Sequence, residues 1–95
     1  MSKYKECFSD MIGSHKTLFE EFKILHDNYA ENKPAWKKEF DEKGQEVLQI
    51  IRRYERILCS HSESGKYGKF STNLSDKFWA EVRSYLPKID FVGVE

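Results

Sequence analysis

Basic and aromatic side chains gather in one part of the sequence, where they have the chemistry to hold an anion. Arginine and lysine bind phosphates, and aromatic rings stack on bases. The candidate ligand-binding residues are Arg52, Arg53, Arg56, His61, Lys66, Tyr67 and Lys69. The segment lacks the residue spacing and the preceding strand of a phosphate-binding loop, and Glu55 and Glu63 dilute its charge. The alternative is a solvated helix end followed by a flexible loop, which needs no ligand.

A second candidate is a metal site formed by Cys7, Cys59 and His61, to which Glu63 could contribute. Thiolate and imidazole groups are the ligands that zinc prefers. A cysteine and a histidine separated by one residue do not have a standard zinc spacing, however. Two cysteines on adjacent helices also serve as small apolar side chains, so this reading stays an alternative.

Catalytic patterns are missing from the sequence. Serines, histidines and carboxylates are present, but no spacing places a nucleophile, a base and an orienting group together. The sequence contains no nucleophile elbow, metalloprotease helix or dinucleotide-binding fingerprint. We therefore expect no catalytic residues and no cofactor.

Two matched apolar faces must position these candidates. Mainly apolar or aromatic side chains recur at alternating steps of four and three residues from Tyr4 to Tyr29, and again from Trp36 to His61, where Lys43 is the one charged member. That spacing indicates one face of a helix turned toward a partner. We predict helices over about 3–31, 34–60 and 75–86, a loop over 61–74 and an extended tail over 87–95. Gly13 interrupts the first helix, and a break there, with Ser14 capping a new start, is the alternative.

The two long helices should form an antiparallel hairpin, because Asn32, Lys33 and Pro34 separate them. Asparagine is a good N-cap and proline suits a first turn. In this register Leu25 faces Phe40, and Cys7 comes close to Cys59 at the open end. The fold prediction is an all-α bundle in which a shorter third helix packs across the open end of the hairpin.

The turn end of the hairpin should then be covered less than the open end. A second apolar set, seven residues apart, widens the face of the first helix. We expect the uncovered part to be a self-association surface. Its candidate interface residues are Phe19, His26 and Trp36.

Bulk properties set the class of protein. With 95 residues, the chain is predicted to form one domain over 1–95. Its 16 basic and 16 acidic residues balance, so binding to nucleic acid is possible but not favoured. No apolar run approaches the roughly 20 residues that span a bilayer, and residues 1–10 do not resemble a secretory signal. We expect no membrane contact, a cytoplasmic location and free cysteine thiols.

The functional expectation is a small soluble protein-interaction or assembly module without catalytic activity, which pairs with itself as a homodimer or with another protein. Helical hairpins of this length often complete a bundle with a second copy. The alternatives are a nucleic-acid or phosphate-ligand binder and a metal-binding helical protein.

Overall fold

The computed structural model describes the backbone of residues 3–63 and 71–94, and the side chains of 3–58 and 74–94. In this part of the chain four helices follow one another and no strand occurs, which confirms the all-α prediction. The elements are α1 (Lys3–Ser14), α2 (Lys16–Glu31), α3 (Lys33–Glu63), α4 (Ser71–Tyr85) and a 3-10 turn, η2 (Ile89–Phe91). None of the described helices combines the length and the apolar character that a bilayer crossing requires.

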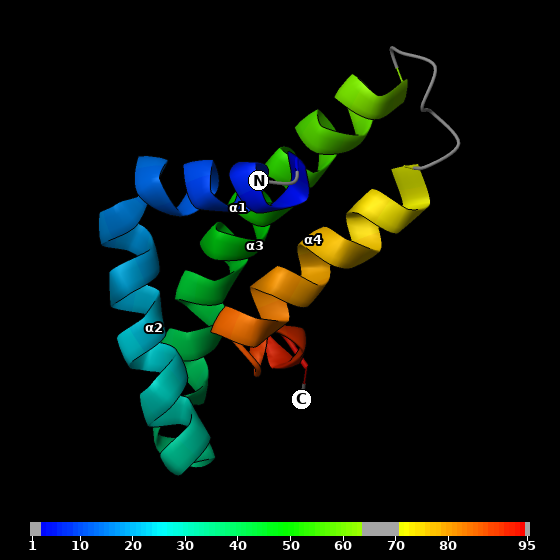
Figure 1. Ribbon diagram of the computed structural model, residues 1–95. Coiled ribbons are helices and arrows are strands. Elements are labelled where there is room, and N and C mark those ends of the chain that lie inside the picture. Colours follow the sequence, from blue (N-terminus) through cyan, green and yellow to red (C-terminus); the bar gives the residue numbers. More distant parts are fainter. Residues whose placement is uncertain (1–2, 64–70, 95) are drawn as a thin grey trace.

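The first predicted helix, over 3–31, is two helices rather than one. His15 separates them, with φ −126° and ψ 39°, far from helical values. Gly13, two residues before the break, lowers the helical propensity there, and a Cβ added to it would meet nothing within 4 Å. The break turns α1 across α3, while α2 runs along α3 (Figure 1). The alternative prediction places the break at Gly13, with Ser14 as the cap of a new helix. The break lies instead at His15, and Ser14 is the last residue of α1.

α2 and α3 form the predicted antiparallel hairpin, and Asn32 makes the turn. Its side-chain oxygen accepts a hydrogen bond from the Ala35 backbone N–H at 3.4 Å, as expected of the N-cap of α3. Across the hairpin, Lys43 pairs with Glu21 at 3.5 Å. Phe40 stacks on Tyr29, with ring centroids 4.0 Å apart. These contacts agree with the predicted register to within about one helical turn.

Phe8 shows how the break changes the packing of α1. The predicted straight hairpin places Phe8 opposite Ile57, but Phe8 instead meets Phe78 and Tyr85 of α4 edge-on, with centroids 6.4 and 6.3 Å apart. Ile57 stays 42% exposed. α1 therefore divides its contacts between α3 and α4.

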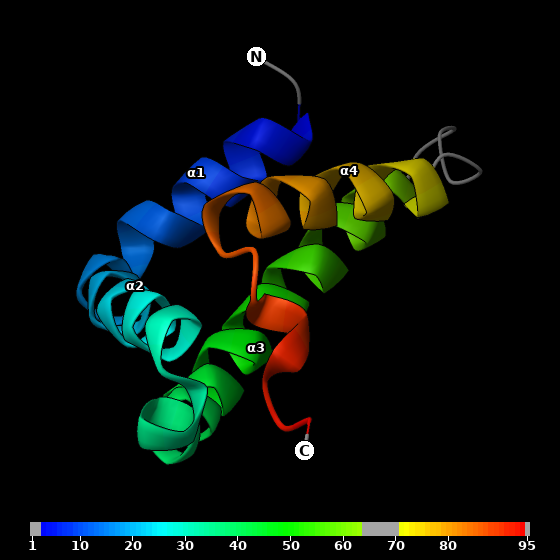
Figure 2. The same ribbon diagram turned by 90° about the horizontal axis from the view of Figure 1, so that it is seen from below.

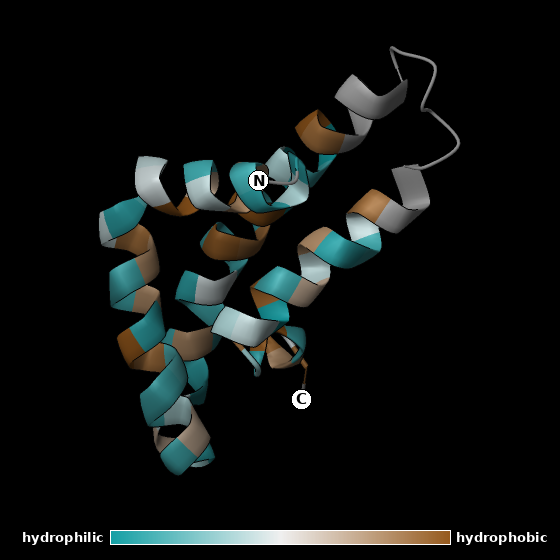
Figure 3. Cartoon of the chain, in the orientation of Figure 1, coloured by the Kyte–Doolittle hydropathy of each residue, from teal (hydrophilic) through white to brown (hydrophobic). Residues whose placement is uncertain are grey.

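α4 begins at Ser71, four residues before the predicted start at 75. Ser75 consequently lies inside the helix, where its hydroxyl donates a hydrogen bond to Glu55 of α3. Phe78, Val82 and Leu86 are buried on the side that faces the hairpin. The hydropathy of the chain changes within single turns of each helix, as expected of amphipathic helices around one core (Figure 3).

The C-terminal tail folds back along α3, as Figure 2 shows. It is not extended throughout, because η2 forms a short turn that buries Ile89. Val92, which follows η2, is buried as well. Two apolar side chains three residues apart fall on the same side of a 3-10 turn, so this turn lets both reach the core.

Candidate functional site

The basic end is only partly described. Arg52, Arg53 and Arg56 are exposed on α3. His61 lies in α3, but its side chain is outside the described part. Lys66, Tyr67 and Lys69 lie outside the described residues altogether. The anion site therefore remains a prediction.

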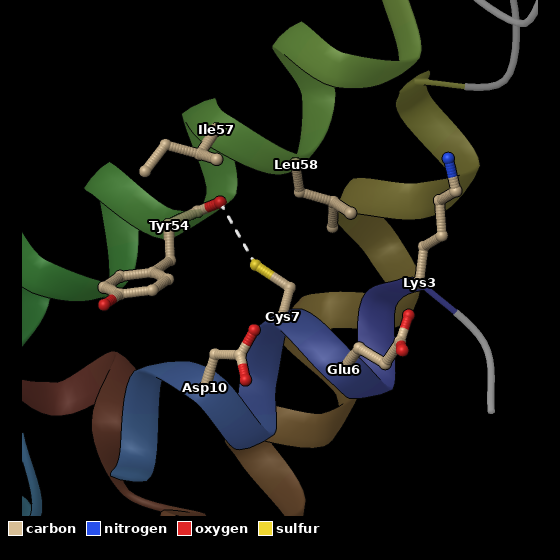
Figure 4. A pocket seen from close by; sticks show the side chains of 7 residues that line it. All are labelled: Lys3, Glu6, Cys7, Asp10, Tyr54, Ile57 and Leu58. Atoms are coloured by element: carbon tan, nitrogen blue, oxygen red, sulfur yellow. Dashed lines mark hydrogen bonds between the residues drawn. The ribbon is translucent and has the colours of Figure 1, made fainter. Parts of the chain in front are cut away.

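Cys7, the described member of the predicted metal site, lies half-buried between α1 and α3. Its thiol donates a hydrogen bond to the Tyr54 carbonyl, with 3.4 Å between sulfur and oxygen. Figure 4 shows this sulfur pointing toward α3 beside a pocket of about 280 Å³. The side chains of Cys59 and His61 are not described. Among residues 3–58 and 74–94, no group of three histidine, cysteine, aspartate or glutamate side chains could hold a metal ion.

The predicted exposure of the interface residues is wrong for two of the three. Phe19 is 1% exposed and His26 is 3% exposed, whereas Trp36 is half-buried. The buried face of α2 consists of Phe19, Phe22, His26 and Tyr29. It combines members of the main apolar face with members of the second set, because α2 contacts the tail as well as α3. The tail contacts His26 through the Lys88 backbone, and the end of α4 reaches the same side of α2, where Lys23 lies over the Tyr85 ring.

His26 links α2 to the tail through one ring nitrogen and bonds to its neighbour Asp27 through the other. Its Nε2 accepts a hydrogen bond from the Lys88 backbone N–H at 2.9 Å, so the proton belongs on Nδ1. Nδ1 lies 3.0 Å from a carboxylate oxygen of Asp27 and donates to it. This hydrogen bond, with help from Lys23, holds the pKa of Asp27 below its ordinary value, although burial opposes the shift. The buried histidine is therefore a structural link, which explains its position in the apolar face.

Asp41 and Gly44 hold the end of the tail on α3. The Asp41 carboxylate accepts a hydrogen bond from the Gly93 N–H at 2.9 Å and pairs with Lys37 at 2.8 Å. Gly93 has φ +76°, a conformation that favours glycine. A Cβ on Gly44 would come within 2.6 Å of the Val92 side chain. The missing side chain of Gly44 thus creates the space that Val92 fills.

Acid should weaken this attachment through Asp41. Burial raises the pKa of Asp41, but the bonds from Lys37 and Gly93 outweigh it, and the pKa lies below its ordinary value. The unfolded chain then binds more protons than the folded one, so stability falls as the pH falls through the lowered pKa. Asp41→Asn keeps an acceptor for Gly93 but cannot titrate. Urea unfolding between about pH 5 and pH 2 should show a smaller loss of stability for the variant than for the wild type, and an equal loss would contradict this role.

The docked tail and the hairpin turn border a shallow, open groove of about 350 Å³. We call it the turn groove, and its lining residues are Tyr29, Lys33, Pro34, Lys37, Phe91 and Val94. Phe91 and Val94 remain 41% and 51% exposed, although both are large and apolar. The ammonium groups of Lys33 and Lys88 lie 5.5 and 5.6 Å from the centre of the Phe91 ring. The groove therefore has apolar walls and a cationic edge.

Sequence reasoning missed the turn groove because one of its walls is the tail. Two signals were available. Gly44 falls on the same helical face as Phe40 and Val47, and a glycine on a buried face marks a close approach by another segment. The tail itself carries four apolar residues, more than a solvated end needs.

The groove presents apolar walls and cationic groups, and its described lining residues include no nucleophile with an adjacent base. Comparisons with protein-family models, with curated proteins and with solved structures find no match for this chain.

Proposed function

We propose that this chain is a small, soluble, non-catalytic protein-interaction module that acts in the cytoplasm and binds its partner at the turn groove. The observation that carries the proposal is the exposure of Phe91 and Val94 beside Tyr29 and Pro34. Exposed apolar side chains that gather at a groove, with a polar rim around them, are typical of protein-binding sites. The partner is another protein or a second copy of the chain.

The position of the groove supports this proposal. Two of the four large apolar side chains that are exposed in the described part line the groove, and the other two, Ile24 and Ile57, lie elsewhere. Tyr29 supplies a rigid floor because it is 4% exposed and stacked on Phe40. A preformed apolar floor lowers the entropy lost on binding.

Site-specific photo-crosslinking tests the proposal in the cells that make the protein. A photoreactive residue at position 94 should give discrete adducts with a partner protein, because Val94 lines the groove. The matched control is position 24, since Ile24 is also an exposed aliphatic residue, at 63%, but lies outside the groove. Adducts of twice the chain mass would identify a second copy, and light scattering should then detect a dimer. Equal labelling at positions 94 and 24, or none at position 94, would contradict the proposal.

A further inference from the structure

We propose that the turn groove recognises an acidic peptide segment that carries an apolar side chain between its carboxylates. This inference rests on the proposed function and specifies the chemistry of the partner. The apolar side chain would lie between Phe91 and Val94, and the carboxylates would pair with Lys33 and Lys88. A groove of about 350 Å³ is near the lower end of the range for ligand sites, about 300–1,000 Å³, which suits one or two side chains of a peptide.

The charge around the groove is the first argument for an acidic partner. In the described part of the chain, Lys37 pairs with Asp41, Lys23 with Asp27, and Lys43 with two glutamates. Lys33 and Lys88 make no such pair there, and both lie over Phe91 instead. Two cations that form no ion pair with a described residue, both close to an exposed ring, are complementary to carboxylates that flank an apolar residue.

The start of α3 adds positive potential at the same place. α3 spans 31 residues from Lys33, and its first turn contains no acidic residue. A helix N-terminus carries a partial positive charge that acidic side chains usually offset. The cationic side chains and the helix end therefore act in the same direction, toward an anionic group in the groove.

A peptide explains the lining better than a nucleic acid does. Single-stranded nucleic acids are bound by a basic track with several stacking rings, whereas of the two aromatic rings among the described lining residues Phe91 is exposed and Tyr29 is buried. Val94 and Pro34 offer aliphatic contacts instead, and the whole chain has no net positive charge. Aliphatic walls with isolated cations suit an apolar side chain flanked by carboxylates.

The test is a titration of the ¹⁵N-labelled full chain with synthetic peptides, followed by NMR. The probe has a leucine–phenylalanine pair with two glutamates on each side. One comparison peptide has lysines in place of the glutamates, and another has serines in place of the apolar pair. We expect chemical-shift changes that saturate at residues 33–37 and 88–94, with at least tenfold weaker binding of both comparison peptides. Equal binding of the lysine peptide, or shifts mainly elsewhere, would overturn the proposal.

A charge-reversal pair links the binding to the two cations. Lys33→Glu with Lys88→Glu should weaken binding of the acidic peptide at least tenfold. The control is Lys5→Glu with Lys16→Glu, two exposed lysines outside the groove, which should change binding less than threefold. Circular dichroism should show that both variants remain helical. Unchanged binding by the first variant, or saturable binding of oligothymidylate in the groove, would overturn the proposal.

The two proposals fail in different ways. If the acidic peptide does not bind but position 94 still gives specific adducts, the acidic class is wrong and the proposed function stands. If the adducts come from a second copy of the chain, the peptide segment is the wrong occupant. If there is neither peptide binding nor a specific adduct, both proposals are wrong.

Discussion

Replacing Phe40 by alanine is expected to lower the free energy of unfolding by about 3–5 kcal/mol. Phe40 is 0% exposed, and its ring lies between those of Tyr29 and Phe22, with centroids 4.0 and 5.4 Å away. Alanine would remove both stacking contacts and leave a cavity in a well-packed region. Because a domain of this size is stable by roughly 5–15 kcal/mol, the loss is a large part of the total.

Chemical denaturation of Phe40→Ala measures this effect, and Ile24→Ala is its matched control. Ile24 is 63% exposed on the same hairpin, so its truncation should change stability by less than about 0.5 kcal/mol. The melting temperature of Phe40→Ala should fall by on the order of 10 °C or more. Similar stability losses in the two variants would show that Phe40 is not central to the hairpin core.

Gly44→Ala is expected to destabilise the protein by about 1–3 kcal/mol through overpacking against the tail. Helix propensity alone predicts the opposite sign, since alanine in a helix is favoured over glycine by about 1 kcal/mol. The added Cβ would lie 2.6 and 2.7 Å from the two methyl carbons of Val92. Valine has a stiff side chain, so the tail itself must move.

Gly13→Ala is the control for this substitution, because a Cβ there meets nothing within 4 Å. It should leave stability unchanged or raise it. A double-mutant cycle with Val92→Ala isolates the contact. Once the methyl groups of Val92 are gone, Gly44→Ala should cost less than in the wild type. An equal cost in both backgrounds would show that Val92 does not dock at Gly44.

The hairpin was predictable because local chemistry and apolar spacing agree at each point along it. Asn32 and Pro34 mark the turn, and the two apolar faces have matching periods. The fold class follows from these features alone. The predicted register places Phe40 opposite Leu25, and the Phe40 ring stacks on Phe22 and Tyr29, which precede and follow Leu25 in α2.

The break at His15 was harder to predict, because the apolar spacing continues through it. Gly13 gave a local signal, but the break follows from tertiary packing, in which Phe8 gains contacts with α4. The buried position of His26 depends on a hydrogen bond to Lys88, 62 positions further along the chain. The spacing of apolar residues within one helix does not show which distant segment packs against it. The turn groove was missed for this reason, because one of its walls is the distant tail.

Amide hydrogen exchange at Lys88 and Gly93 tests most directly that the tail docks on the hairpin and forms a wall of the turn groove. Both N–H groups donate to side chains of the hairpin, at 2.9 Å to His26 Nε2 and at 2.9 Å to Asp41. NMR should show that the two amides exchange more slowly than those of an unstructured chain, and that Gly44→Ala speeds their exchange whereas Gly13→Ala does not. Exchange of both amides at the unstructured rate in the wild type would contradict the docked tail, and with it the groove on which the proposed function depends.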